Sequence, residues 1–431
     1  MQLTISTDQR ISNTLLLNAS FIDNLGIMHG KMGISICFFH LARQTGNQIY
    51  EDYAGELIDE IYEEITANTP VGFENGLAGI GWGIEYLVQN GFIEADTDEV
   101  LEEFDNRIFK ELIYNTPHDI GLLNGLVGIG AYFLKRIQNP ASNDEKIPTL
   151  TNKQTLIHII DELDRKTQNI PEIISEPLSE RSPSVKPSNL ETYEPPNEKR
   201  QTTNHEPQTT NKQFDLTWDC PALLWFLAEL YEQNIFNFKV EKIIQRLTEP
   251  LSKESNMPKL HSNRLLLALA LTKLQKNNSG QPTANNERQT TVEPSKLQIS
   301  VKSSSSRTLE QSSNSLRKES YGQTIIEQLS NLLTKINRNT INSELPPHNT
   351  TLRYGTSGIA WIYQQLHRQT GDNHFKEEME YWHQLPFKSE KSNEIFSGIN
   401  NESLNAWGML EGLAGMLLNN ETINLKKQKK R

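Results

Sequence analysis

The chain has 431 residues, of which 42 are Lys or Arg and 54 are Asp or Glu, so its formal charge is −12. This charge excludes a protein that binds nucleic acid through phosphate contacts, because such a protein needs a positive surface. The two cysteines, Cys37 and Cys220, are too few for a disulfide scaffold and indicate a reducing, cytoplasmic location. No run of about 18 apolar residues occurs, so the sequence predicts no membrane span.

Only 36% of the residues are hydrophobic, which is low for a compact globule of this length. Two polar segments, 171–213 and 277–322, dilute the folded part and hold only two of the 33 aromatic residues, Tyr193 and Tyr321. Segments of this composition bury too little apolar surface to offset their ordering entropy, so both are predicted to be disordered insertions. The remainder of residues 1–431 is predicted to form a single domain.

A Gly-x-x-Gly pair followed by an apolar residue recurs along the chain. The five pairs are Gly30 and Gly33, Gly76 and Gly79, Gly125 and Gly128, Gly355 and Gly358, and Gly412 and Gly415. The long interval between the third and fourth pairs leaves room for two degenerate copies, which begin near Trp218 and His261. The sequence therefore predicts seven units of about 49 residues each.

Each unit is predicted to be a helical hairpin. The first helix is apolar on nearly every side, as in 80–88, and is therefore expected to be buried. The second is amphipathic and acidic, as in unit two, where apolar residues recur at helical spacing from Val100 through Phe104 to Leu112. Buried first helices and half-polar second helices predict an all-α fold of two concentric rings, an α/α toroid. An open solenoid is the alternative that periodicity leaves open.

A longer repeat supports the same register in the first and sixth units. The second glycine of each unit, Gly33 or Gly358, is followed ten residues later by an Arg-Gln-Thr-Gly run that begins at Arg43 or Arg368. With these repeats, the folded chain resembles the lanthionine synthetase C-like (LanC-like) family. The resemblance implies a seven-unit α/α toroid and a role in the modification of ribosomally made peptides.

The best-known members of that family are zinc enzymes, which add a peptide cysteine thiol across a dehydroalanine or dehydrobutyrine. Their zinc is held by a Cys before the glycine pair of unit five and a Cys-His pair before that of unit six. In this chain the unit-six position reads Arg353-Tyr354, and the unit-five position falls near His261, without a cysteine. A zinc site with one open position needs three protein ligands, so we expect no metal and no other cofactor.

The resemblance also implies that the loops before the first helices face a central cavity. The candidate site residues are His29, Glu74, Asp119, Asp219, Cys220, His261, Arg353, Tyr354 and Glu411. No catalytic role is assigned to any of them. Asn75 and Asn124, which precede two of the glycine pairs, are interpreted as helix N-caps. At Arg353 a guanidinium would take the place of the metal cation and offer a fork to a carboxylate or amide of a bound peptide.

Three functions remain open at this point. The first is a zinc-free homologue of the cyclase that binds a precursor peptide or scaffolds a partner modification enzyme. The second is an active lanthionine cyclase with an altered ligand set drawn from Cys220, His261 and His29. The third is a carbohydrate-active toroid enzyme, which needs two carboxylates about 5–10 Å apart.

Overall fold

The computed structural model describes most of the folded chain. The described residues are 7–140, 146–168, 218–252, 256–258, 260–278, 328–329, 332–333, 336–345, 351–353, 355–388, 409 and 414–415. The two segments predicted to be disordered lie outside these residues, except for the last two positions of helix α12, Asn277 and Asn278. Every regular element in the described part of the chain is helical.

The α-helices are α1 (Thr7–Asn18), α2 (Lys31–Thr45), α3 (Gln48–Glu64), α4 (Leu77–Gln89), α5 (Thr97–Val100), α6 (Glu102–Tyr114), α7 (Leu126–Ile137), α8 (Ile147–Lys166), α10 (Asp219–Glu232), α11 (Asn237–Thr248), α12 (His261–Asn278), α14 (Arg338–Glu344), α15 (Thr356–Thr370) and α16 (Asn373–Lys388). Two short 3-10 helices, η1 (Ala19–Phe21) and η2 (Glu249–Ser252), follow α1 and α11.

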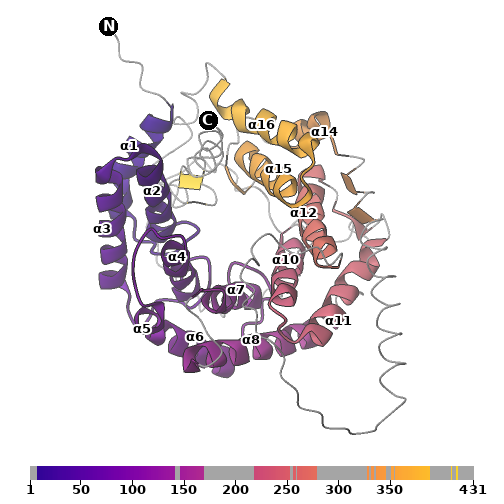
Figure 1. Ribbon diagram of the computed structural model, residues 1–431, viewed down its shortest axis with the longest axis horizontal. Helices are drawn as coiled ribbons and strands as arrows, with labels where there is room; N and C mark the ends of the chain where they lie inside the picture. The colour runs from indigo at the N-terminus through magenta and orange to yellow at the C-terminus, as the bar shows by residue number, and fades with distance from the viewer. Residues whose placement is uncertain are drawn as a thin grey trace, which may run out of the picture.

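The helices form two concentric rings (Figure 1). The inner ring runs through α2, α4, α7, α10, α12 and α15, and each of these helices packs against the next. The outer ring consists of α3, α6, α8, α11, α14 and α16, each packed on the inner helix of its own unit. The prediction of an α/α toroid of helical hairpins is therefore confirmed.

The second glycine of each pair explains why the repeat exists. A Cβ added to Gly79 would collide with the backbone oxygen of Phe73 in its own loop and lie 2.8 Å from Ile27 Cγ2 of the preceding unit. Only glycine allows an inner helix to approach both surfaces this closely. A Cβ on Gly33 would likewise lie 3.1 Å from Met409 Cβ, so unit one meets unit seven. This contact closes the ring and rules out the open solenoid.

The shared Arg-Gln-Thr-Gly run is partly a helix terminator. Gly46 (φ 68°) and Gly371 (φ 73°) end α2 and α15 in the left-handed conformation that favours glycine. The preceding threonines, Thr45 and Thr370, each bond back to a carbonyl one turn earlier, at 2.7 and 2.8 Å. The capping therefore accounts for the glycine and the threonine of the run, but not for its arginine.

The predicted apolar stripe of unit two needs one correction. The Asp96 side chain accepts a hydrogen bond from the Asp98 amide and starts a separate short helix, α5. This helix ends before Leu101, and α6 begins after it. Phe104 is buried as expected, whereas Val100 at the end of α5 is 37% exposed. The stripe that packs on the inner ring thus begins one residue later than the sequence predicts.

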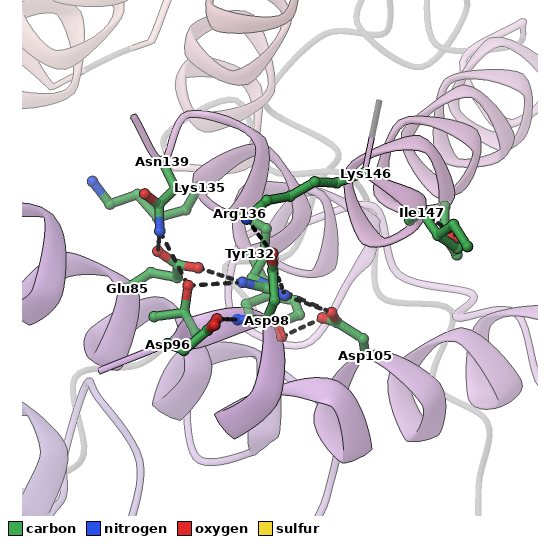
Figure 2. Close-up of polar contacts among 12 residues, drawn as sticks. Glu85, Asp96, Asp98, Asp105, Tyr132, Lys135, Arg136, Asn139, Lys146 and Ile147 are labelled. Carbon is green, nitrogen blue, oxygen red and sulfur yellow. Dashed lines mark hydrogen bonds and ion pairs between the residues drawn. The ribbon is translucent and has the colours of Figure 1, made fainter. Parts of the chain in front are cut away.

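A buried charge cluster ties unit two to unit three (Figure 2). The Arg136 guanidinium on α7 lies 2.6 Å from Glu85 on α4, 3.0 Å from Asp105 on α6 and 3.3 Å from Asp98 on α5. Tyr132 donates a 2.5 Å hydrogen bond to Asp105. Arg136 and Glu85 are both buried, and Glu85 is 0% exposed. One buried guanidinium therefore pairs with carboxylates from three helices, of which Glu85 is fully buried.

Candidate functional site

The loops that precede the inner helices are joined to one another. Met28 N donates to the Glu74 carbonyl of the next loop at 3.2 Å, and Glu74 N donates to the Leu123 carbonyl of the loop after that at 2.8 Å. Each loop also accepts the first amides of its own helix; for example, Leu77 N donates to Pro70 O at 2.9 Å. These bonds satisfy the helix ends and fix the loops as a connected rim on one side of the ring.

The interpretation of Asn75 and Asn124 as helix caps is wrong. The capping positions are the glycines that follow them, and these make no side-chain bond to the helix. Asn75 Oδ1 instead accepts from Asn24 Nδ2 at 2.8 Å, and Asn124 Nδ2 donates to Glu74 Oε2 at 2.9 Å. Because the loop carbonyls already serve the first helical amides, the asparagine side chains are left to connect adjacent loops.

Glu74 is hydrogen-bonded to residues of both neighbouring loops. His29 Nε2 lies 3.0 Å from Glu74 Oε1, and Asn124 holds the second carboxylate oxygen. The hydrogen bond from His29 lowers the pKa of Glu74, and Asn124 and the charge of Arg353 lower it further, against the opposing effect of burial. His29 is only 3% exposed, and its Nδ1 has no hydrogen-bond partner among the described residues. The rim therefore holds an ionised carboxylate.

The charge of Arg353 of unit six acts on this carboxylate of unit two. The Arg353 guanidinium carbon lies 5.7 Å from the ring centroid of Trp218 at the start of unit four. Arg353 thus interacts with residues of two other units that are distant in sequence. Sequence reasoning did not select Trp218 as a site residue, although its place at the start of a degenerate unit was a usable signal.

Asp119 and Asp219 lie at a second point on the rim. A Cβ on Gly121 would lie 3.2 Å from Asp119 Oδ1 and closer still to Asp219 Oδ1, so both carboxylates flank the same position. Asp119 Oδ1 also accepts the Gly121 amide at 2.7 Å. The sequence placed both residues at loop positions, and the structure brings them together.

Two predicted site residues belong elsewhere. Cys220 is fully buried in the main hydrophobic cluster, as is Cys37, so its thiol is not on the rim. His261 Nδ1 lies 2.6 Å from Glu344 of α14, whose carboxylate also accepts the amides of His261 and Ser262. The imidazole is thus part of an outer-helix contact that caps α12. Tyr354 and Glu411 lie outside the described residues.

The rim offers hydrogen-bonding groups and charges of both signs. In the part of the chain that the structure describes, no group of three or more His, Cys, Asp or Glu side chains could hold a metal ion. Where the resemblance implies zinc ligands, the sequence has Arg353 and Tyr354 in unit six and His261, which is bonded to Glu344, in unit five. Of these residue types only histidine is a usual zinc ligand. The Arg353 guanidinium can donate to carbonyl or carboxylate oxygens, and the Glu74 carboxylate can accept from amides.

The Glu74 contact gives a testable dependence of stability on pH. Because the folded-state pKa of Glu74 is lowered, its ionised form stabilises the fold above the unfolded-state pKa, and this stabilisation is lost as the pH falls through the folded-state pKa. Glu74→Gln is expected to cost less than about 1 kcal/mol at neutral pH. Urea unfolding should show this difference shrinking below about pH 4; a difference that grows as the pH falls would contradict the contact.

The family comparison defines the class of protein. The model of the family "Lanthionine synthetase C-like protein" matches residues 22–181 and 319–430, which is more than half of the chain. The chain therefore belongs to the LanC-like family, as its repeats predicted. Curated protein sequences give no match.

Among solved structures, the chain is similar to one described as "Nisin cyclase". The two share 15% sequence identity with a TM-score of 0.57, and the alignment covers 97% of this chain and 93% of that chain. At this identity the likeness shows the fold alone, and that fold is the double ring of Figure 1. No helix in the described ranges is long and apolar enough to cross a membrane.

Proposed function

We propose that this LanC-like protein binds a precursor peptide in lanthipeptide-type modification, or scaffolds a partner enzyme on it, and does so without zinc. The proposal is supported by Arg353, which stands where the resemblance implies a metal ligand, acts through its charge on Glu74 and lies 5.7 Å from the ring centroid of Trp218. A guanidinium is always protonated and cannot ligate a metal. It supplies a fixed positive charge with several donors, which suits peptide carbonyls and carboxylates.

The rim can offer a peptide backbone both hydrogen-bond donors and acceptors. Arg353 offers donors, while the Glu74 carboxylate, oriented by His29 and Asn124, offers an acceptor. Holding these groups on bonded loops reduces the cost of ordering them on binding. A peptide segment that crosses the rim would meet Trp218 beside Arg353, and its side chains would gain apolar contact there.

The two alternative functions have less support. An altered zinc site would have to recruit Cys220 from the hydrophobic core and His261 from Glu344. A carbohydrate enzyme has a candidate carboxylate pair in Asp119 and Asp219, but fold analogy is a weak guide to chemistry. Membership in the LanC-like family favours a peptide ligand over a sugar.

The proposal is tested with full-length protein and the dehydrated form of a lanthipeptide-type precursor peptide. We expect binding that a zinc chelator does not change, and no loss of alkylatable thiols from the peptide. Arg353→Gln should weaken binding about tenfold, whereas Arg165→Gln, an exposed arginine of α8 with a single i,i+3 pair, should not. Chelator-sensitive binding, thiol loss, or equal affinity of the two variants would contradict the proposal.

A further inference from the structure

Three inner helices carry an accessible tryptophan at the same position of the repeat. In α4, α10 and α15 a tryptophan stands three residues after the second glycine position: Trp82, Trp225 and Trp361. Each is at least partly exposed between buried neighbours, and Trp361 is 37% exposed. The outer ring covers the opposite side of these helices, so the tryptophans lie on the inner face of the ring.

On α4 this face is a flat aromatic surface. Trp82 and Tyr86 stack with centroids 5.4 Å apart and planes 11° apart, and Phe92 extends the stack at 6.4 Å from Tyr86. The hydroxyl of Tyr86 is fixed by a 2.8 Å hydrogen bond with His40 of α2. Rings held in this way present a preorganised apolar surface at little entropic cost.

Three cations from three other inner helices act on this aromatic surface. Lys135 Nζ of α7 lies 5.8 Å from the ring centroids of Trp82 and Tyr86. The guanidinium carbon of Arg43 of α2 lies 3.4 Å from the ring centroid of Phe92. Burial raises the pKa of Tyr86, and the charges of Arg43 and of Arg368 from α15 oppose that rise. Arg43 and Arg368 are the equivalent arginines of the Arg-Gln-Thr-Gly repeat, whose capping role did not explain them.

These cations are not neutralised by carboxylates in the described part of the chain. Ion pairs within 4.0 Å are absent there for Arg43, Lys135 and Arg368. The carboxylates whose charges act on Lys135 are Glu85, which is bonded to Arg136, and Glu229, which is bonded to Lys273. Burial lowers the pKa of Lys135, which is partly buried, whereas the side chains of Arg43 and Arg368 are exposed. A partly buried lysine without an ion pair is unexpected in a protein of formal charge −12.

All three cations stand in the last turn of their own helices, where the helix dipole favours positive charge. Arg43 donates to the carbonyls of Asn90 and Gly91 just after α4, at 2.9 Å each, as expected for a cation at a helix C-terminus. Among the described residues, Lys135 donates no hydrogen bond to a helix-end carbonyl, and the hydrogen-bond partner of Arg368 is the side chain of Gln365, at 3.4 Å. Two cations on this face are therefore available to a ligand.

We propose that Arg43, Lys135 and Arg368, with the aromatic surface of Trp82 and Tyr86, form a binding site for an acidic peptide segment. The inference rests on the proposed function, because it names the part of a bound peptide that this second surface would hold. Side-chain carboxylates would pair with the cations, and neighbouring apolar side chains would pack on the rings. Cations spread over three helices suit several carboxylates, and nearby helix C-termini disfavour a compact anion that approaches their carbonyls.

The test uses full-length protein and a fluorescently labelled synthetic peptide of alternating glutamate and leucine. Fluorescence anisotropy should show binding that weakens with added salt and is lost when glutamine replaces glutamate in the peptide. The double variant Lys135→Gln/Arg368→Gln should bind at least about tenfold more weakly. The control Lys110→Gln/Arg165→Gln makes the same charge change on outer helices α6 and α8 and should bind as the wild type does. Thermal unfolding confirms that each variant is folded.

The outcomes separate this site from the proposed function. Failure of the wild type to bind the acidic peptide, equal binding of the glutamine peptide, or equal affinity of the two double variants would overturn the site. Displacement by inorganic phosphate, beyond that caused by chloride at equal ionic strength, would assign the cations to a phosphate ligand and also overturn it. A precursor peptide that binds wild type and Lys135→Gln/Arg368→Gln equally would remove the site but keep the function.

Discussion

Arg136→Met is expected to destabilise the protein by about 3–5 kcal/mol, the cost of leaving a buried charge without its partner. Arg136 lies 2.6 Å from Glu85, whose side chain is fully buried, and also holds Asp105 and Asp98 (Figure 2). Methionine fills similar volume, so the loss reports the charge rather than a cavity. Denaturant unfolding followed by circular dichroism measures the change.

A second variant separates charge from packing at this cluster. Adding Glu85→Leu to Arg136→Met removes the stranded carboxylate and should recover part of the lost stability. The control Arg165→Met removes an exposed i,i+3 pair with Glu162 and should change stability by less than about 1 kcal/mol. A loss of less than about 1 kcal/mol for Arg136→Met would show that units two and three do not depend on the cluster.

Gly79→Ala is expected to cost about 3 kcal/mol, at the upper end for an overpacked site. The added Cβ would collide with the Phe73 carbonyl and with Ile27 of the preceding unit, and backbone cannot yield as a flexible side chain does. Gly55→Ala in outer helix α3 is the matched control, because a Cβ there meets nothing within 4 Å. It should stabilise the protein by about 0.5–1 kcal/mol through helix propensity. Thermal unfolding of both variants gives the comparison.

The sign of each effect decides the interpretation of the repeat. If Gly79→Ala were neutral, inner helices would not need close approach at the second glycine, and the closed ring would require another explanation. If Gly55→Ala were as damaging as Gly79→Ala, glycine would be needed for a reason other than packing between units. Close packing at the second glycine requires that Gly79→Ala destabilises the protein and that Gly55→Ala stabilises it.

The double ring could be predicted from the sequence because the packing rule is local. Five of the seven units repeat a glycine where the inner helix meets its own loop, and in four of these the preceding unit also lies against that glycine. A short motif therefore carries much of the geometry of the ring. The Arg-Gln-Thr-Gly run is local for the same reason, since its glycine and threonine end the helix that contains them.

The candidate site could be predicted only in part, because its contacts connect units that are far apart in the chain. The loop positions of His29, Glu74 and Arg353 followed from the repeat, but nothing local predicts that Arg353 acts on Glu74. The prediction that Asn75 caps a helix was wrong for a related reason. Its neighbour Asn24 is 51 residues away and could be identified only once the loops were placed side by side.

The inner-face site could likewise be predicted only in part, because its residues come from distant units. The arginines at 43 and 368 belong to a recognisable repeat, yet their shared neighbour, Tyr86, lies in a unit that lacks the run. The helical register placed Trp82 and Trp361 at equivalent positions, but only their exposure in the folded ring distinguishes them from core residues.

The zinc content of the purified full-length protein tests most directly the claim that this LanC-like chain holds its peptide without a metal. Protein prepared without chelators and with zinc supplied during expression is measured by inductively coupled plasma mass spectrometry. The account predicts far less than one zinc ion per chain and unchanged peptide binding after dialysis against a chelator. Close to one zinc ion per chain, whose removal abolishes peptide binding, would contradict it.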